Sequence, residues 1–466
     1  MDNLILSTDS YKSCHYLCYP PNMDGMFSYI ESRGGKYENV LWFGLQAILK
    51  RYFTEPITLA NIAEADDFFK AHGEPFPLEG WMSVLLDHGG KIPLRIKSVP
   101  EGTVVPTHNV LMTVESTDPK LFWLVSWFET LLMRTWYPTT VATISMYCKK
   151  YILEALKRTG DPKLVDFKLH DFGARGVSSG ESAAIGGAAH LVNFMGSDTV
   201  EGVCLANKVY DIPMAGFSIP AAEHSTITAW GKESEVDAFE NMLNKFAKPQ
   251  KLVAVVSDSY DLWNAIDHLW GEKLRQKIID SGATVILRPD SGSPIEVVVK
   301  ALKMLDEKFG SVSNNKGFKV LNNVRVIQGD GINPDSIQDI LAAAARAGYS
   351  ADNVSFGMGG GLLQHCNRDT QRFAYKCSAA HFPVLGWVDV RKDPITDPEK
   401  ASKGGRLTLY SKDGVYRTGI QNESWEDKKV DMLQEVLYNG ITINKCTFQQ
   451  VRERARMGLE RLISPY

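Results

Sequence analysis

The sequence of 466 residues contains few cysteines and no segment typical of membrane or secreted proteins. Its seven cysteines are odd in number and scattered, which predicts free thiols in a reducing compartment and not a disulfide framework. The most membrane-like stretch, residues 121–136, is interrupted by Glu129 and Arg134 and is shorter than a bilayer requires. The first residues, MDNLILSTDSYK, lack the pattern of a signal peptide. We therefore expect a cytoplasmic protein that binds no membrane.

The sequence also lacks an excess of positive charge. Its 51 lysines and arginines are outnumbered by 55 aspartates and glutamates, and the net charge of −4 provides no general attraction to nucleic acid. Cys14, His15 and Cys18 resemble half of a metal site, but no second close pair completes four ligands, so we expect them to be structural. We expect no nucleic-acid partner, and an anionic ligand has to be bound by local cations.

The length and the 44% of hydrophobic residues predict a globular protein with two domains, or a large barrel with an appendage. Alternating apolar residues in the first third of the chain predict a mixed α+β domain at residues 1–155. Its expected elements are antiparallel strands at 26–30, 92–96 and 110–114 and two helices at 123–136 and 144–156, separated by Pro138.

From about residue 160 apolar strands alternate with helices, which indicates a parallel sheet covered by helices. Six or more such units favour an irregular (β/α) barrel, which we place at residues 156–390. The tail 391–466, with a hairpin at Asp413-Gly414 and a helix at 448–462, is expected to pack back on the N-terminal domain. The expected barrel strands are 164–169, 215–219, 252–256, 284–287, 324–327 and 354–356.

Polar or glycine-rich segments follow nearly every one of these strands. Each segment alone has an ordinary interpretation as a helix cap, a turn or a flexible connection. In a parallel barrel, however, all the strand C-termini open on the face that carries the active site, so the segments are expected to converge. They are 170–173 with Arg175, 196–198, 257–259, 288–292, 328–331 and 357–361.

The residue types in these segments predict a site for a phosphosugar and an aromatic base. Consecutive glycines allow backbone N–H groups to approach a phosphate, and arginine or lysine side chains pair with its oxygens. Carboxylates accept hydrogen bonds from sugar hydroxyls or oppose positive charge on the ring, and aromatic side chains stack on the base. The candidates are the cations Arg175, Arg288, Arg368 and Lys376, the carboxylates Asp258, Asp290 and Asp330, and the aromatics Phe172 and Tyr11.

One histidine, His224, lies in the polar stretch GFSIPAAEHSTITAW at 216–230. A lone histidine is more often a core residue whose imidazole is satisfied by the backbone. A phosphosugar site nearby gives His224 a task, either as a general acid/base or as a nucleophile toward a phosphoryl group. The residues themselves leave both roles open.

Six motifs closely resemble the nicotinamide phosphoribosyltransferase family, and the similarity extends from TDSYK at 8–12 to KDP-x-x-DP at 392–398. The resemblance implies a homodimeric type II phosphoribosyltransferase, a pentosyltransferase of NAD salvage. Such an enzyme condenses nicotinamide with phosphoribosyl pyrophosphate to give nicotinamide mononucleotide and pyrophosphate, with Mg²⁺ and with coupled ATP hydrolysis. The motifs are HDFGARGVSS (170–179), GFSIPAAEHSTITAW, VVSDSYD (255–261), RPDSG (288–292), RVIQGDG (325–331) and FGMGGGLLQ (356–364).

The resemblance also implies roles for individual residues, with the active sites at the subunit interface. His224 is implied to be phosphorylated by ATP, and Asp258 to orient it. Phe172 is implied to stack on one side of the pyridine ring, and Tyr11 of the partner subunit on the other. The metal ligands stay unassigned. Asp290 is implied to be a catalytic residue near the ribose, and Ser218 to be a further substrate-binding residue. The other implied contacts are Asp198 and Arg288 at the carboxamide, Arg175 near the phosphate, Gly329, Asp330, Gly359 and Gly360 at ribose and phosphate, and Arg368, Lys376, Arg33 and Lys400 around the phosphates.

Three positions depart from the family pattern: Ala254 and Ala374 stand where the family can have serine, and His365 where it can have lysine. A nicotinate phosphoribosyltransferase is an alternative, but Asp198 favours the amide because it accepts from an N–H₂ group and repels a carboxylate. A second alternative is a non-catalytic binding or signalling protein on the same fold, which has no need for a reactive histidine, its carboxylate and a glycine-rich loop together.

Overall fold

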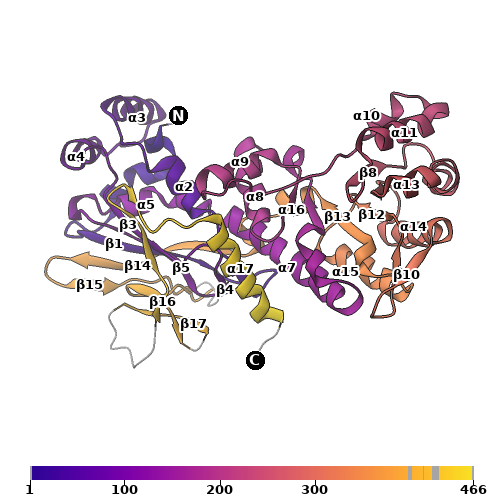
Figure 1. Ribbon diagram of the computed structural model, residues 1–466. Helices are drawn as coiled ribbons and strands as arrows, with labels where there is room; N and C mark the ends of the chain where they lie inside the picture. Colours follow the sequence, from indigo (N-terminus) through magenta and orange to yellow (C-terminus); the bar gives the residue numbers. More distant parts are fainter. Residues whose placement is uncertain (1–2, 397–400, 413, 422–429, 464–466) are drawn as a thin grey trace. The chain divides into compact units, whose positions relative to one another are not determined.

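The computed structural model describes residues 3–396, 401–412, 414–421 and 430–463, which form two compact units. The two units do not end where the sequence predicted the domains to end. The boundaries in the structure lie after residues 143 and 365, whereas the predicted ones lie after residues 155 and 390. Helix α7 (Trp136–Thr159) runs across the first boundary, and strand β14 (Phe373–Phe382) pairs with β1 (Gly25–Ser32) and so joins the first unit (Figure 1). Unit 1 is Met1–Thr143, Lys208–Ile212 and Cys366–Leu462, and unit 2 is Ile144–Asn207, Pro213–His365 and Ile463–Tyr466.

Unit 1 contains a seven-stranded antiparallel sheet. Strand β1 lies inside it between β14 and β5 and is buried at seven of its eight positions. The antiparallel strands expected from the alternating pattern are confirmed, although β3 begins two residues later than expected. The strand order is β15 (Gly386–Asp389), β14, β1, β5 (Val110–Ser116), β3 (Leu94–Ser98), β19 (Gln434–Tyr438) and β20 (Ile441–Thr442).

The tail residues 407–412 and 415–420 form the hairpin β16–β17 of a three-stranded sheet with β18 (Val430–Asp431). Of the expected turn, Gly414 has a positive φ of 80°, whereas Asp413 lies outside the described residues. The final helix is α17 (Phe448–Ile463), close to its expected bounds. Nearly all of it belongs to the same unit as the N-terminal strands.

The apolar run at 121–136 is not one helix. It forms a 3-10 turn and the short helices α5 (Leu124–Trp127) and α6 (Glu129–Met133), because Phe128 leaves helical geometry. The two residues Trp123 and Trp127 pack edge to face with Trp81 of α4 (Leu78–His88) at 5.5 and 5.3 Å, so the run forms an aromatic core. Pro138 does not separate two helices either, since it lies in the first turn of α7, where the missing N–H is tolerated. No helix in the described ranges combines the length and apolar character that a membrane span needs.

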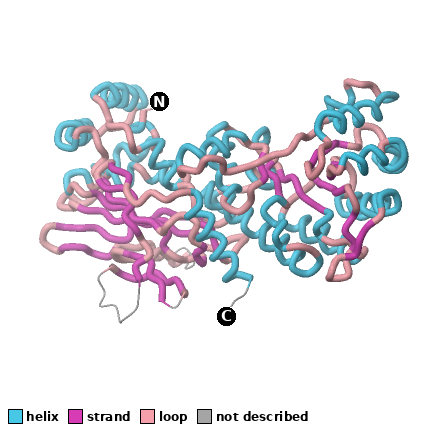
Figure 2. The backbone as a smooth tube through the Cα atoms, in the orientation of Figure 1, coloured by secondary structure: helices cyan, strands magenta, loops and turns pink. Residues whose placement is uncertain are grey.

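Unit 2 contains six parallel strands flanked by helices (Figure 2). The four strands expected after residue 250 are confirmed. The one expected at 164–169 is wrong except for its last residue, because Asp161 caps a 3-10 helix at Pro162–Phe167 and the strand begins only at Leu169. The strand order is β7 (Gly196–Ser197), β6 (Leu169–Asp171), β13 (Val354–Met358), β12 (Val324–Gln328), β9 (Thr284–Arg288) and β8 (Leu252–Val256).

The ring of strands is closed by residues 217–221, which are too irregular to form the strand expected at 215–219. Phe217 makes a parallel bridge to Gly196 of β7, and Ala221 makes one to Ala254 of β8. The two edge strands are therefore joined through this segment, and the expected irregular barrel is confirmed. Helices connect the strands: α8 (Gly180–Leu191), α9 (Val200–Val209), α11 (Glu235–Phe246), α13 (Arg275–Ser281), α14 (Pro294–Phe309) and α15 (Pro334–Arg346).

Candidate active site

His224 is the first residue of the short helix α10 (His224–Thr228), which directly follows the segment that closes the barrel. Its side chain is 45% exposed, so it is not a core histidine. Nδ1 lies 3.1 Å from the Ser259 hydroxyl, and Nε2 lies 3.8 Å from Asp258 Oδ1 and 3.5 Å from Asp290 Oδ2. The imidazole thus faces two carboxylates and remains open to a ligand.

Asp258 follows strand β8 and is held by the loop that follows the neighbouring strand β9. Its Oδ2 accepts hydrogen bonds from the Asp290 backbone N–H at 2.9 Å and from the Ser291 hydroxyl at 2.6 Å. Its Oδ1 is buried and has no hydrogen-bond partner among the described residues, although it faces His224. A carboxylate fixed in this way orients an imidazole and stabilises positive charge on it.

Four of the expected residues meet at the ends of β6, β9 and β12. A Cβ atom built on Gly329 would lie 3.3 Å from Asp290 Oδ1, 3.5 Å from Phe172 Cε2 and 3.8 Å from Arg288 Cδ. Arg288 Nε is buried and has no hydrogen-bond partner among the described residues. The strand-end loops therefore converge as the barrel topology predicted, and they bring together an aromatic ring, a guanidinium group and a carboxylate.

The Phe172 ring lies against the backbone of the neighbouring strand β13. A Cβ atom on Gly357 would lie only 1.8 Å from Phe172 Cε2, so only glycine leaves room for the ring there. Behind the ring lies an apolar cluster formed by Ala254, Ile286 and Ile327. Gly357 was not identified as a site residue from the sequence, where it was one of several glycines in a loop. Its role follows from the pairing of β13 with β6, in which Gly357 lies opposite His170.

Asp198 follows strand β7 and is exposed, and its Oδ1 accepts a hydrogen bond from the Ser218 hydroxyl. The Asp198 N–H donates to the Asp171 carbonyl at 3.0 Å, which fixes the loop to β6. The other oxygen accepts no hydrogen bond among the described residues, and a carboxylate oxygen can accept from an amide N–H₂ group. Burial lowers the pKa of the neighbouring His170, so this imidazole is neutral at physiological pH and does not offset the charge of Asp198.

The glycine-rich loop after β13 lies beside the 3-10 helix that carries Arg175. A Cβ atom on Gly176 would lie 3.7 Å from the Gly360 backbone nitrogen, and one on Gly360 would lie 3.3 Å from His365 Nε2. Arg175 and His365 are both exposed. The loop offers backbone N–H groups and two basic side chains, which suits a phosphate. Asp330 is exposed at the end of β12, where its backbone carbonyl accepts from the Gln328 side chain at 3.1 Å.

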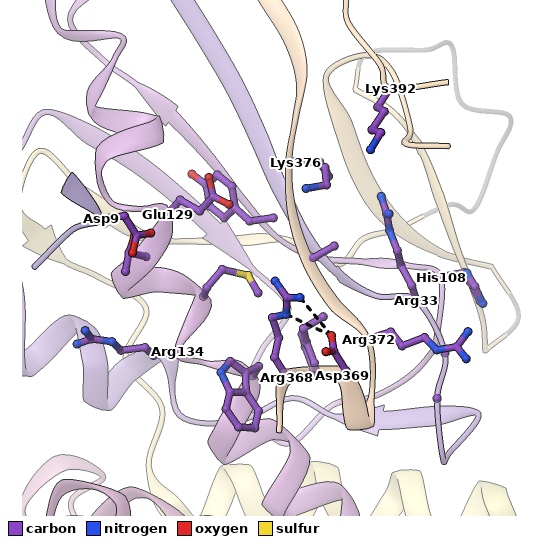
Figure 3. Close-up of a pocket in the computed structure, with 18 of the residues that line it drawn as sticks. Asp9, Arg33, His108, Glu129, Arg134, Arg368, Asp369, Arg372, Lys376 and Lys392 are labelled. Atoms are coloured by element: carbon purple, nitrogen blue, oxygen red, sulfur yellow. Dashed lines mark hydrogen bonds and ion pairs between the residues drawn. The ribbon is translucent and has the colours of Figure 1, made fainter. Parts of the chain in front are cut away.

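The remaining expected residues line a cavity of about 1210 Å³ in unit 1 (Figure 3). Burial lowers the pKa of Lys376 in this cavity, and the nearby cations Arg33, Lys392 and Arg368 lower it further. The cavity therefore holds crowded positive charge. Lys400 lies outside the described residues. The expected residues in the lining are Tyr11, Arg33, Arg368 and Lys376, and those that the sequence analysis did not single out include His108, Arg134, Arg372 and Lys392.

Glu235, at the start of α11, is a further acidic residue close to Asp258, and no sequence motif marks it. Its side chain is buried, and its Oε1 has no hydrogen-bond partner among the described residues. Burial, and after it the nearby carboxylates of Asp261 and Asp258, raises the pKa of Glu235 to about 7. An acidic residue in the first turn of a helix is common for reasons of the helix dipole alone, so the sequence pattern could not reveal this environment.

The chain matches known phosphoribosyltransferases along most of its length. A profile of the nicotinamide phosphoribosyltransferase N-terminal domain matches residues 3–96, and one of the nicotinate phosphoribosyltransferase (NAPRTase) family matches residues 167–441. The nicotinamide phosphoribosyltransferase of Xanthomonas campestris pv. campestris is 56% identical over 461 residues, which cover 98% of each chain. The chain belongs to the nicotinamide phosphoribosyltransferase family. The protein of that name from Mycoplasma pneumoniae is 33% identical, over 86% of this chain and 95% of its own.

Solved structures share the fold at low sequence identity. The nicotinate-nucleotide pyrophosphorylase from Pyrococcus furiosus aligns with a TM-score of 0.65 at 14% identity, over 100% of this chain and 98% of its own. Human nicotinic acid phosphoribosyltransferase aligns with a TM-score of 0.61 at 16% identity, over 98% and 94% of the two chains. These structures support the type II phosphoribosyltransferase fold and no finer statement about the substrate.

Replacement of Glu235 by glutamine should change how stability depends on pH. The native carboxyl keeps its proton up to about pH 7, whereas the unfolded chain loses it near the ordinary pKa of 4.5. The native state therefore binds more protons in this window, and the free energy of unfolding falls as the pH rises through it. Glu235→Gln removes this loss, so we expect the variant to gain stability relative to the wild type between pH 5 and pH 8, measured by urea denaturation.

The matched control is Glu240→Gln on the same helix. Glu240 is 44% exposed and forms an ion pair with Lys277 at 2.7 Å, so its replacement should bring no such gain. A stability difference between wild type and Glu235→Gln that stays constant over this pH range contradicts the prediction.

Proposed function

We propose that the protein condenses nicotinamide with 5-phosphoribosyl 1-pyrophosphate to form nicotinamide mononucleotide and pyrophosphate. The observation that carries this proposal is the convergence of Phe172, Arg288 and Asp290 around Gly329, beside the His224–Asp258 pair. The family membership and the 56% identity to a nicotinamide phosphoribosyltransferase support it. A non-catalytic protein has no use for this set of residues.

The arrangement suits substitution at the anomeric carbon. The pyridine nitrogen attacks that carbon as the bond to pyrophosphate breaks, and positive charge develops on the ribose ring. The Asp290 carboxylate is close to Gly329, where the ring is proposed to bind, and favours this charge. Phe172 holds the pyridine ring, and the loop at Gly359 and Gly360 with Arg175 binds the 5′-phosphate.

We propose that Mg²⁺ enters the site together with the pyrophosphate group. Among the described residues no group of three or more histidine, cysteine, aspartate or glutamate side chains is arranged to hold a metal ion. This fits a cation such as Mg²⁺, which commonly uses substrate phosphates for much of its coordination. When bound, Mg²⁺ neutralises charge on the leaving pyrophosphate.

Recognition of the amide is proposed to depend on Asp198. Its carboxylate accepts from the amide N–H₂ group but repels the carboxylate of nicotinate. We expect purified protein to release pyrophosphate with nicotinamide far faster than with nicotinate. Asp198→Asn should lower the ratio of the two kcat/KM values by about tenfold or more, since a tenfold change corresponds to about 1.4 kcal/mol. An unchanged ratio removes Asp198 from amide selection, and no pyrophosphate release with either base refutes the function.

ATP hydrolysis is proposed to be coupled through phosphorylation of His224. The exposed imidazole can accept a phosphoryl group, and the fixed carboxylate of Asp258 stabilises the charge that forms on the ring. We expect His224→Ala to abolish ATP hydrolysis and to leave slow transfer that no longer responds to ATP, measured by phosphate release and nucleotide formation.

His268→Ala is a matched control for this variant. His268 is 52% exposed and pairs with Glu272 at 3.1 Å, but it lies on another helix than His224. Retention of ATP coupling in His268→Ala and its loss in His224→Ala support the assignment. Full coupling in His224→Ala refutes it.

We further propose a homodimer in which the cavity of unit 1 completes the site of the partner subunit. Tyr11 supports this proposal because its side chain is 57% exposed, although its neighbours are fixed. Lys12 Nζ, at 2% side-chain exposure, lies 2.7 Å from Glu129 Oε2, and Thr130 donates to Asp9 at 2.6 Å. An exposed ring on a rigid turn is arranged to contact another molecule.

Mixed dimers test this shared site. Tyr11→Ala and Phe172→Ala should each weaken nicotinamide binding strongly as homodimers. If each site takes Tyr11 from one subunit and Phe172 from the other, heterodimers of the two variants contain one intact site. Equal mixing with subunit exchange should then restore about a quarter of wild-type activity at low nicotinamide. A mixture no more active than the separate variants contradicts the shared site.

We propose a cytoplasmic location for the enzyme. None of the seven cysteines, all of which lie among the described residues, forms a disulfide, and burial raises the pKa of Cys366 and Cys377 to about 11. Free thiols support a reducing compartment.

A further inference from the structure

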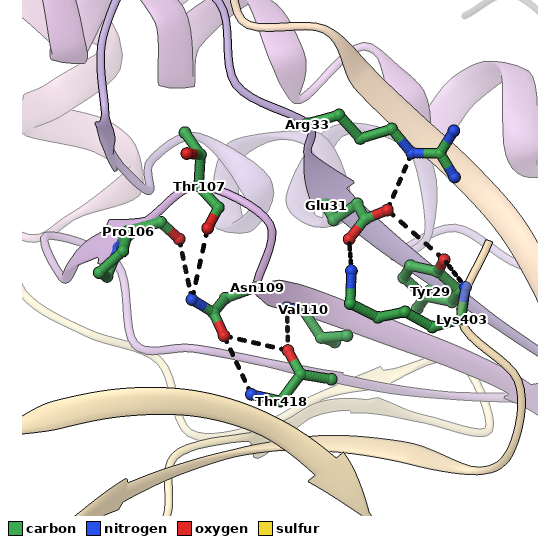
Figure 4. Close-up of polar contacts among 9 residues, drawn as sticks. All are labelled: Tyr29, Glu31, Arg33, Pro106, Thr107, Asn109, Val110, Lys403 and Thr418. Atoms are coloured by element: carbon green, nitrogen blue, oxygen red, sulfur yellow. Dashed lines mark hydrogen bonds and ion pairs between the residues drawn. The ribbon is translucent and has the colours of Figure 1, made fainter. Parts of the chain in front are cut away.

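A buried carboxylate lies behind the cationic cavity of unit 1. Glu31, on strand β1, has a side-chain exposure of 2%. Its Oε1 accepts from Arg33 Nε at 2.9 Å and lies 3.5 Å from the Tyr29 hydroxyl, and its Oε2 pairs with Lys403 Nζ (Figure 4). Both oxygens are thus occupied by groups from three residues, two of them cations.

The contact with Glu31 fixes the Arg33 side chain through Nε, the guanidinium nitrogen nearest the backbone. Nε is bound to Glu31, and the Arg33 N–H donates to the Arg372 carbonyl at 3.1 Å, so both the side chain and the backbone are held. The outer nitrogen NH2 is buried and has no hydrogen-bond partner among the described residues, although Arg33 lines the cavity. Figure 3 shows the side chain extending toward Lys376 and Lys392. A guanidinium group held in this way keeps its outer nitrogens for anionic oxygens.

The same contacts anchor a second segment of the cavity wall. The Tyr29 hydroxyl accepts from the Lys403 backbone N–H at 3.0 Å. The preceding residue, Ser402, exchanges two hydrogen bonds of 2.8 Å with the backbone of Lys392, which lines the cavity. Burial, and then the Glu31 carboxylate, raises the pKa of Tyr29 to about 12, so Tyr29 stays a neutral hydroxyl at physiological pH.

The positive charges in the cavity explain why a buried carboxylate behind Arg33 matters. Arg33, Lys376 and Lys392 repel one another in the cavity, where Glu129 of the lining supplies part of the counter-charge to Lys376. A carboxylate on the protein side of Arg33 offsets part of this repulsion and leaves the ligand side unpaired. Removal of the negative charge would leave two cations without their buried partner, which is costly.

We propose that Glu31 is a positioning residue of the cavity, which holds Arg33 and Lys403 so that the cations are preformed to bind a pyrophosphate group. The identification of the anion as the pyrophosphate of the ribosyl substrate rests on the proposed function. Glu31 itself does not line the cavity. It acts through Arg33, and through Tyr29 and Lys403 on the segment that carries Lys392.

The test is Glu31→Gln, which keeps the size of the side chain and removes its charge. We expect the dissociation constant of inorganic pyrophosphate, measured by calorimetry on the full-length protein, to rise by about tenfold, the usual scale for loss of a charge-assisted contact. The KM for phosphoribosyl pyrophosphate should rise in parallel, while kcat and the KM for nicotinamide stay within about twofold of the wild type. If Glu31 had a purely structural role, Glu31→Gln would lower stability but would not raise the KM for phosphoribosyl pyrophosphate selectively over the KM for nicotinamide.

Glu115→Gln is the matched control. Glu115, on strand β5 of the same sheet, is 11% exposed and also bridges two cations, Arg95 at 3.2 Å and Arg406 at 2.7 Å, but it does not line the cavity. We expect it to lower the melting temperature and to leave pyrophosphate affinity unchanged. Equal affinity of wild type and Glu31→Gln, or an equal loss in both variants, overturns the proposal.

Tyr29→Phe provides a second variant if Glu31→Gln does not fold. It retains the buried ring and removes only the hydroxyl between Glu31 and Lys403, and it should weaken pyrophosphate binding severalfold. Unchanged binding in Tyr29→Phe then overturns the proposal, as does absence of pyrophosphate binding by the wild type. Pyrophosphate binding is measured without turnover, so the two proposals can fail separately. If the wild type forms no nucleotide but still binds pyrophosphate more tightly than Glu31→Gln does, the proposed function is refuted and the role of Glu31 stands.

Discussion

The hydrogen bonds between Asp258 and the loop after β9 determine the arrangement of the barrel site. They fix one carboxylate oxygen with the Asp290 N–H and the Ser291 hydroxyl, and so bring the ends of β8 and β9 into one unit. The other oxygen is left for His224. Because Asp290 belongs to the same loop, the residue proposed to face the ribose is hydrogen-bonded through its own backbone to the carboxylate proposed to orient the histidine. Any coupling between ATP hydrolysis and transfer would pass through this loop.

The charges of the two proposed half-sites are complementary. The barrel site presents the carboxylates of Asp198, Asp258 and Asp290, whereas the cavity of unit 1 gathers arginines and lysines. Transfer of a ribosyl group produces positive charge on the sugar and requires stabilisation of a pyrophosphate anion as it leaves. Carboxylates serve the first need and cations the second. Each site holds groups of both kinds, since Arg288 lies with Asp290 in the barrel, and Glu129 and Asp369 line the cavity together with its cations.

Much of the barrel could be predicted from the sequence because its later strands are apolar throughout and end in polar motifs. The convergence of Phe172, Arg288 and Asp290 followed from topology alone. The wrong prediction of a strand at 164–169 has a local cause, because the cap Asp161 and Pro162 favour a 3-10 helix at 162–167. Glu31 could not be found, because its role depends on Lys403, 372 residues further along the chain. The need for a glycine at position 357 could not be predicted either, because it depends on the register of β13 with β6.

Two of the three departures from the family pattern, Ala254 and Ala374, place a methyl group where the family can have a hydroxyl. Ala254 lies in an apolar cluster with Ile286 and Ile327, so Ala254 offers no hydroxyl to an amide, and the proposed amide recognition depends on Asp198 and Arg288. Ala374 lies in the lining of the unit 1 cavity and lies opposite Glu31 in the pairing of β1 with β14. The methyl group there offers no hydrogen bond to an anion, so the cations of the lining carry more of the proposed binding. Cations that repel one another bind a pyrophosphate well only if their geometry is fixed beforehand. The carboxylate behind Arg33 therefore contributes more to pyrophosphate affinity than it would if residue 374 supplied a neutral hydrogen-bond donor.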